Sequence, residues 1–233
     1  MRLLTFAIAA VLAMPLAAAT RYTATVGSQK ATVLADGAHR RVDIPRQSQP
    51  FEFDVLLSDD GGATFTALNT PLKTWFRTNA TAIERRPHIF WHELMTRISV
   101  RDIHVTTTDE PEHRSVIKTT FTVNEPRVTV KFASTIEIWT TDSVDAALAV
   151  RPVDLITSYP EVDAQLLPAL AKVHGFPIKT VLTATRVYVG GRPQTLTYRA
   201  TVSGIETVAA PKHAFERPAD FVNQPPLLGV PGK

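Results

Sequence analysis

The sequence predicts a mainly β domain of the α+β class, built from antiparallel strands with one or two short helices. Three observations support this fold class. Apolar residues recur at every second position through most of the chain, and only two stretches have helical spacing. Turns containing glycine or proline separate the alternating segments. The chain has 44% hydrophobic residues and no cysteine, so we expect a packed core without disulfides.

Residues 128–140 form the clearest predicted strand. Its odd positions are mostly polar, and its even positions hold the apolar residues Val128, Val130, Phe132, Ile136 and Ile138. This alternation predicts a half-buried antiparallel strand. Because the segment is longer than most strands, we expect curvature or a bulge near Ser134. Residues 115–123 alternate in the same way, and Asn124-Glu125-Pro126 predicts the turn of a hairpin between the two segments.

A second hairpin is predicted near the end of the chain. Runs rich in β-forming residues at 179–189 and 194–205 flank Gly190-Gly191, and glycine can adopt the positive φ angles of hairpin turns. In the second run, every second residue is placed on one face: Leu196, Tyr198, Ala200 and Val202. The N-terminal third contains further β-like runs, at 21–26, 31–35, 40–44, 51–57, 63–68 and 71–77.

Two stretches have the spacing of short helices. Residues 87–97 form the weaker candidate, and residues 163–174 form the stronger one. Asp163 can cap the second helix, its leucines form an apolar stripe, and Gly175 is a typical end signal. Pro168 lies inside this stretch and removes one backbone hydrogen bond, so we expect a kink or a late start.

Residues 1–19 have the features of a secretory signal peptide. Arg2 precedes an apolar run, and Ala17-Ala18-Ala19 supplies the small residues of a cleavage site after Ala19. The residue that follows is threonine rather than cysteine, and no later apolar run is long enough to span a bilayer. We therefore expect a periplasmic or secreted protein with neither a transmembrane segment nor a lipid anchor.

The remaining chain has the length of one domain. We predict a single β-rich domain over residues 20–221, with a possible subdivision near residue 112. Residues 222–233 are rich in proline and glycine, so we expect an extended or disordered tail.

Charge and motif content argue against several function classes. The formal net charge is +3, and the basic residues are scattered among acidic ones. No stretch combines clustered basic residues with aromatic ones, so nucleic acid is not an expected partner. The chain lacks cysteine nucleophiles and the Gly-x-Ser-x-Gly motif of serine hydrolases. Pro111 is surrounded by the acidic residues Asp109, Glu110 and Glu112. A proline at this place favours a solvated turn over a catalytic carboxylate pair. We therefore predict a protein without catalysis or a cofactor.

Residues 58–65 match the Asp-box pattern Ser-x-Asp-x-Gly-x-Thr-aromatic, a hairpin turn found in sialidases and β-propellers. We expect Asp60 to accept N–H groups of the turn, Gly62 to adopt a left-handed conformation and Phe65 to anchor the returning strand. In those families the motif is structural, so one copy predicts a well-formed hairpin rather than a sialidase.

His88 and His92 are four residues apart in the first candidate helix, a spacing that can hold zinc. His92-Glu93 begins the zinc-protease motif His-Glu-x-x-His, but position 96 is threonine, so the motif is incomplete. A third ligand would have to come from another part of the chain. We expect no metal site, and a metal-dependent hydrolase is the third functional hypothesis.

The C-terminal half contains an order of motifs that resembles a known group of proteins. Trp139-Thr140 ends a long strand, Gly175-Phe176-Pro177 follows a helical segment, and Phe215-Glu216-Arg217-Pro218 closes the domain after a hairpin. Over about residues 112–221, this order resembles small exported bacterial proteins that look like relatives of the outer-membrane lipoprotein carrier (LolA-like) superfamily. The resemblance implies a strongly curved antiparallel sheet, or half-open β-barrel, with the helices on its concave side.

Such a shell implies a binding or carrier protein for a lipid or another apolar ligand, because its concave face can enclose an acyl chain. On this hypothesis Phe132, Ile136 and Ile138 line the ligand site, together with Trp139 from the polar side of the strand. Alternatively, the apolar face packs only on the helix at 163–174. An exposed apolar patch on a filled barrel would favour a cell-envelope structural or protein-interaction module without a small ligand.

Overall fold

The computed structural model describes residues 18–45, 53–79, 99–125, 128–149 and 159–224. The strands are β1 (Ala18–Val26), β2 (Gln29–Asp36), β3 (His39–Asp43), β4 (Val55–Ser58), β5 (Thr64–Asn69), β6 (Thr74–Asn79), β7 (Ser99–Glu110), β8 (Arg114–Glu125), β9 (Val128–Thr141), β10 (Phe176–Tyr188), β11 (Gln194–Ala209) and β12 (Val222–Asn223). An α-helix, α2 (Pro160–Leu170), and a 3-10 turn, η4 (Ala146–Leu148), complete the described elements.

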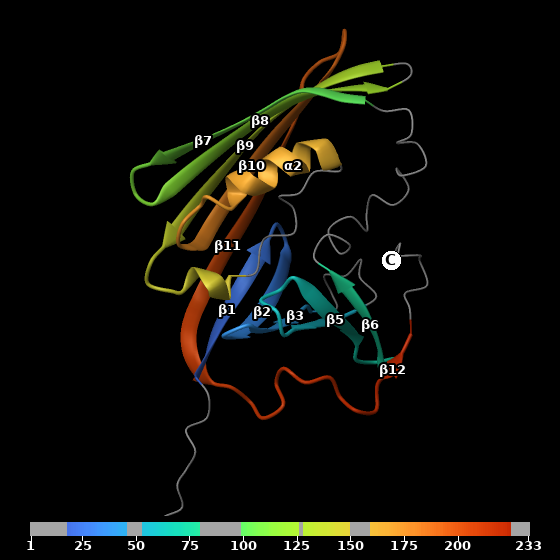
Figure 1. Ribbon diagram of the computed structural model, residues 1–233, viewed down its shortest axis with the longest axis vertical. Coiled ribbons are helices and arrows are strands. Elements are labelled where there is room, and N and C mark those ends of the chain that lie inside the picture. Colours follow the sequence, from blue (N-terminus) through green and yellow to red (C-terminus); the bar gives the residue numbers. More distant parts are fainter. Residues whose placement is uncertain (1–17, 46–52, 80–98, 126–127, 150–158, 225–233) are drawn as a thin grey trace, which may run out of the picture.

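These strands form one sheet in the order β12-β6-β5-β4-β3-β2-β1-β11-β10-β9-β8-β7. All its pairs are antiparallel except β12 with β6. Figure 1 shows the long strands β7–β11 with α2 on one face, continued by the short strands β1–β6. The mainly β fold class is therefore confirmed.

The sheet is neither closed nor strongly curled, so the strongly curved sheet or half-open barrel that the resemblance implies is wrong. A barrel requires its first and last strands to pair. Here β7 and β12 are the two ends of the strand order, and the two residues of β12 pair with β6 instead. Strands β1–β6 form one half of the sheet and strands β7–β11 form the other. The two halves are joined where β1 pairs with β11, from Ala18↔Ala209 to Val26↔Ala200.

The short strands β1–β6 confirm the β-like runs predicted in the N-terminal third. Their largest cluster of buried side chains contains Tyr22, Val33, Val42, Phe53, Leu56, Phe65, Ala67 and Phe76, together with Phe176 from β10. Phe176 is fully buried, and its ring meets Tyr22 edge-on at a centroid distance of 5.3 Å. The core of the N-terminal half therefore depends on a residue from the C-terminal half.

The long strands confirm both predicted hairpins, β8 with β9 and β10 with β11. The bulge expected near Ser134 is absent, because Ser134 pairs in regular register with Thr119 and with Ala184. The irregularity in this region lies instead between Pro177 and Lys179 of β10. Because the neighbouring strands are of similar length, 12 residues in β8 and 13 in β10 against 14 in β9, the length of β9 is matched by its partners and needs no interruption.

Strand β7 has no counterpart in the sequence prediction. It is an edge strand with a mixture of exposed and half-buried residues, so its apolar alternation is weak. Its register shifts between Arg101 and His104, where Asp102 has a positive φ of 55°. Bulges of this kind are common at sheet edges, where they limit pairing with other chains. Asp109 and Glu110 belong to the end of β7 rather than to a loop.

Helix α2 starts three residues earlier than predicted, at Pro160, because proline at the first helical position has no N–H to leave unpaired. Tyr159, not Asp163, is the N-cap, and Pro168 lies inside the helix. Gly175 follows with a φ of 84°. The candidate helix at 87–97 lies outside the described residues, as do His88 and His92.

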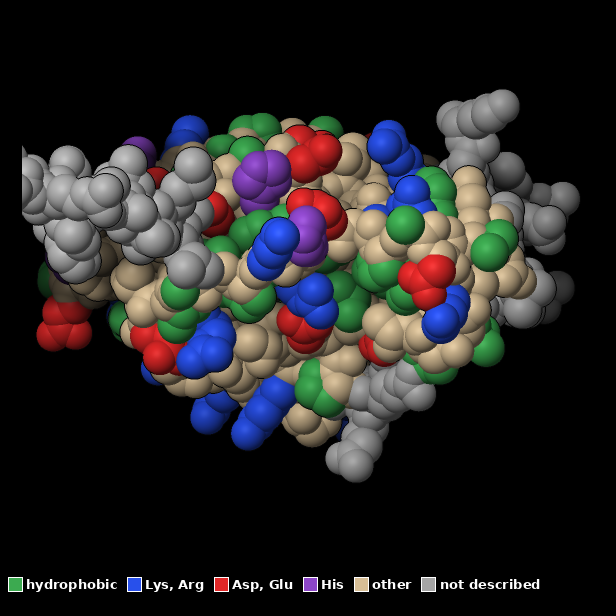
Figure 2. Space-filling view, turned by 90° about the horizontal axis from the view of Figure 1, so that it is seen from below, with side chains coloured by type: hydrophobic (Ala, Val, Ile, Leu, Met, Phe, Trp, Pro, Cys, Tyr) green, Lys and Arg blue, Asp and Glu red, His purple; other side chains and the backbone are tan. Residues whose placement is uncertain are grey.

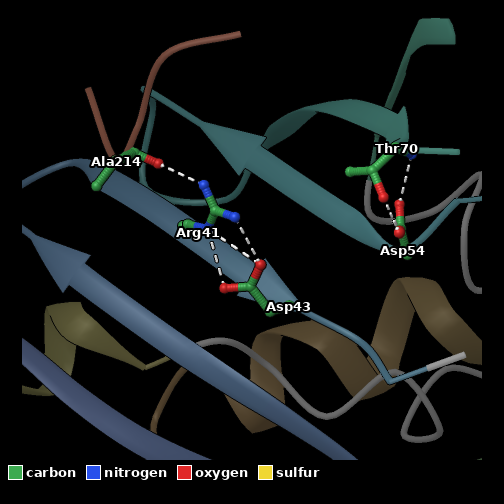
Figure 3. Close-up of polar contacts among 5 residues, drawn as sticks. All are labelled: Arg41, Asp43, Asp54, Thr70 and Ala214. Atoms are coloured by element: carbon green, nitrogen blue, oxygen red, sulfur yellow. Dashed lines mark hydrogen bonds and ion pairs between the residues drawn. The ribbon is translucent and has the colours of Figure 1, made fainter. Parts of the chain in front are cut away.

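Residues 210–224 form a C-terminal strap that runs across the end of the short strands (Figure 1). Figure 3 shows that Arg41 pairs with Asp43 and donates to the carbonyl oxygen of Ala214 in the strap, at 3.1 Å. In the same view, the carboxylate of Asp54 accepts the backbone N–H of Thr70 at 2.9 Å. The strap ends in β12, so the predicted tail begins as an extended strand.

The Asp-box hairpin between β4 and β5 forms as predicted. The Asp60 carboxylate accepts the backbone N–H of Thr64 at 2.9 Å and its hydroxyl at 2.6 Å, while Ser58 Oγ accepts the N–H of Gly62 at 2.9 Å. Gly62 has a φ of 95°, and Phe65 is buried in the core. Chiefly because the Thr64 hydroxyl donates to it, the pKa of Asp60 falls from 3.8 to about 2.

This geometry predicts a pH-dependent loss of stability in the hairpin. A carboxylate whose pKa is lowered on folding stabilises the protein above its unfolded pKa and ceases to do so as the pH falls through its folded pKa. Asp60→Asn should therefore lower the free energy of unfolding by about 1 kcal/mol at pH 7, and the difference should narrow between pH 4 and pH 2. Urea unfolding measures this, with Asp59→Asn as the control. An equal loss from both variants would contradict the assignment.

Candidate functional site

The predicted ligand-binding residues Phe132, Ile136 and Ile138 lie on the face of β9 that carries α2. Ile136 and Ile138 are buried in one cluster with Leu166 and Ala169 of the helix. Phe132 stacks on Phe121 at a centroid distance of 4.8 Å, and both rings lie within 6 Å of Tyr159 just before the helix. The helix and its N-cap therefore occupy this part of the sheet.

Trp139 lies on the opposite face of β9, so the structure does not bring it together with the other three predicted residues. Lys179 Nζ lies 4.0 Å from the centroid of the indole ring, and the Arg114 guanidinium carbon lies 5.4 Å from it. Both are cation–π contacts. Trp139 is half-buried between these cations.

The apolar face continues past α2 onto the next two strands. The helix packs nearest to β7 and β8. Cross-strand pairs, which share a face, link Ile136 to Leu182 and Leu182 to Tyr198. The adjacent row links Ser134 to Ala184 and Ala184 to Leu196. We define the β10–β11 strip as Leu182, Ala184, Leu196 and Tyr198.

The β10–β11 strip is open to solvent along β11. Leu196 is 53% exposed and Tyr198 is 42% exposed, whereas Leu182 and Ala184 are half-buried. Strand β1 pairs with β11 only as far as Ala200, and within the described residues no strand pairs with the outer edge of residues 194–198. The sequence placed Leu196 and Tyr198 on one face, but their exposure depends on which part of that face α2 covers, and no local pattern shows this.

An open pocket of about 390 Å³ lies elsewhere, between the segment after β9 and the adjoining ends of β1 and β11. It is lined by Thr20, Ser143, Val144, Asp145, Leu148, Ile205, Glu206 and Thr207. Glu206 at this site is paired with Arg21 at 2.8 Å. The polar lining is a poor match for an acyl chain, which is bound best by an apolar surface.

Arg40 holds the segment that forms one wall of this pocket. Its side chain is buried, and it donates to the carbonyl oxygens of Gly37 at 2.6 Å, of His39 at 2.7 Å and of Ala147 in η4. Burial, the largest cause, lowers the pKa of Arg40, while Tyr22, Asp145 and Asp36 act in the other direction. The Tyr22 hydroxyl adds a second tether by donating to the carbonyl oxygen of Leu148 at 3.0 Å. The role of Arg40 here is structural.

The described residues lack two further features. In that part of the chain, no group of three or more His, Asp or Glu side chains is placed to hold a metal ion. None of its helices is long and apolar enough to cross a membrane.

The chain matches no known protein family and no curated protein. The motifs that carry the resemblance do meet in space, because Thr140 pairs with Pro177 and Thr141 pairs with Phe176. Gly175 approaches Thr140 so closely that an added Cβ would lie 3.0 Å from its side chain. The third motif, around Phe215, lies in the strap and contacts His39.

Proposed function

We propose that the protein is an exported, periplasmic or secreted binding or carrier protein for a lipid or another apolar ligand, without catalysis. The observation that carries this proposal is the exposed β10–β11 strip beside α2. Clusters of exposed apolar side chains on soluble proteins commonly mark binding surfaces. The signal-peptide features and the resemblance to lipoprotein carriers support the same function and compartment.

The proposed binding mode differs from the one suggested by the sequence. Ile136 and Ile138 hold the helix, while the ligand covers Leu196 and Tyr198. Leu182 belongs to the cluster that Leu170 and Val173 also contact at the C-terminal end of α2. An acyl chain on the strip would therefore extend an existing apolar cluster. Each methylene removed from water adds up to about 0.8 kcal/mol, so affinity should rise with chain length.

A pair of adjacent substitutions tests this site. Leu196→Asp places a charge in the strip, and we expect it to weaken binding of the neutral fluorescent probe N-phenyl-1-naphthylamine by about tenfold or more. Thr197→Asp is the matched control, because it adds the same charge on the opposite face of the same strand. Both positions are exposed, so both variants should fold. Equal probe affinity of the two variants would contradict the proposal.

One observation favours a second function, a cell-envelope structural or protein-interaction module. The unpaired edge of β11 at residues 194–198 could accept a strand from another protein, and Leu196 and Tyr198 would then pack against that partner. This reading predicts that the protein binds no apolar probe and that Leu196→Asp disrupts a complex instead. Titration with the probe and analytical ultracentrifugation of the same samples separate the two functions.

A further inference from the structure

The face of β7–β11 opposite α2, here called the outer face, concentrates the basic residues that are scattered along the sequence. Cross-strand pairs place Lys118, Thr135, Thr183 and Thr197 in one row across the sheet. The same registers place six basic residues on the outer face: Arg101, Arg114, Lys118, Lys131, Lys179 and Arg199. Its acidic members are Glu110, Glu137 and, beyond the end of β10, Glu206, which is paired with Arg21 of β1; most of the other side chains are threonines.

Among the residues that the structure describes, several of these cations have no acidic partner. Arg114 is paired with Glu137, and Arg101 lies 3.7 Å from the carboxylate of Asp102. In contrast, Lys118, Lys131 and Arg199 are exposed and make no ion pair within the described chain. Figure 2 shows a different arrangement at the lower end of the molecule, where basic and acidic side chains are interspersed. The outer face therefore carries an excess of positive charge.

The cations of the outer face are spread over a plane rather than gathered in a groove. Lys118, Lys131, Lys179 and Arg199 lie on four neighbouring strands, β8 to β11, of a sheet that is not strongly curled. A groove suits a single anionic polymer, whereas dispersed cations on an open face suit a planar array of phosphate groups. Threonine hydroxyls between the cations can donate hydrogen bonds to the same oxygens.

Trp139 adds an apolar element to this surface. Its half-buried ring lies against Lys179 and near Arg114 on the outer face. Tryptophan favours the headgroup region of bilayers, because its ring is apolar while its N–H needs a polar partner. A tryptophan among lysines and arginines fits an anionic membrane surface better than it fits solvent.

We propose that the outer face binds the surface of a membrane rich in anionic phospholipid. The attraction is electrostatic, with the basic side chains near lipid phosphates and Trp139 at headgroup level. This inference goes beyond the proposed carrier function and does not depend on it, since the β10–β11 strip lies on the other face of the same strands.

Co-sedimentation of the exported protein with vesicles tests the proposal. Vesicles that contain phosphatidylglycerol should bind the protein at low ionic strength, and vesicles of pure phosphatidylcholine should not. Binding should weaken strongly as salt shortens the Debye length from about 30 Å at 0.01 M to about 8 Å at 0.15 M. The double variant Lys118→Glu/Lys131→Glu should lower the affinity for the anionic vesicles by about tenfold or more.

Lys172→Glu/Lys212→Glu is the matched control, because it makes the same change in net charge at exposed positions outside the outer face. Its vesicle binding should stay within about twofold of the unmodified protein. Equal loss in the two variants, equal binding to neutral vesicles, or no binding to anionic vesicles at low salt would overturn the proposal. If the protein bound heparin but not anionic vesicles, and only the Lys118→Glu/Lys131→Glu variant lost heparin binding, the partner of the outer face would be a soluble polyanion and not a membrane.

Discussion

Replacement of Phe176 by alanine should lower the free energy of unfolding by about 3–5 kcal/mol, the usual cost of removing a fully buried phenylalanine. The side chain is 0% exposed and packs edge-on against Tyr22. It comes from β10 but belongs to the core of the short strands, so its loss should weaken the contact between the two halves of the sheet. Urea unfolding monitored by circular dichroism measures the change.

Val189→Ala provides the comparison for this experiment. Val189 follows β10 directly and is 70% exposed, so its truncation should change stability by less than about 0.5 kcal/mol. A loss below about 1 kcal/mol for Phe176→Ala would show that the core of the short strands does not depend on this ring.

Replacement of Arg40 by alanine should cost about 2–4 kcal/mol, because it removes the donor of three partly buried hydrogen bonds and empties a buried position. The guanidinium bridges Gly37 and His39 in one turn to Ala147 in η4, which is distant in sequence. The backbone amides of Leu148 and Ala149 should therefore exchange hydrogen faster in the variant, whereas those of the β8–β9 hairpin should change only through global stability.

Arg77→Ala is the control, because Arg77 is exposed on β6 and its loss should have little effect. If Arg40→Ala were as stable as Arg77→Ala, the described hydrogen bonds of Arg40 would contribute nothing to the fold. If only global stability fell, without faster local exchange at η4, Arg40 would not tether this segment.

Local patterns predicted much of the fold. Alternation located the short strands and both long hairpins, and the Asp-box pattern predicted the turn around Asp60 down to its hydrogen-bond acceptor. Strand β7 was missed because an edge strand exposed on much of its surface does not alternate clearly. The start of α2 was misplaced because Asp163 is a residue type typical of an N-cap, whereas the helix begins three residues earlier with Pro160 at its first position.

Long-range pairing explains the other differences. The half-open barrel was implied by the resemblance, whereas the shape of the sheet depends on pairs between distant segments, such as Arg21↔Glu206, which no local pattern shows. The same dependence hid the β10–β11 strip, which is exposed because α2 packs over β7 and β8 and leaves this part of the face uncovered. Arg40 follows His39 and precedes Arg41 in a run typical of a surface, yet it is 1% exposed because η4 folds over it.

The most direct test of the proposed carrier function is native mass spectrometry of the exported protein, purified without detergent. The carrier hypothesis predicts a fraction with an added mass in the range of a lipid, which disappears on solvent extraction and is reduced in Leu196→Asp but not in Thr197→Asp. A bare polypeptide mass for the unmodified protein, or an adduct retained equally by both variants, would contradict an apolar ligand on the β10–β11 strip.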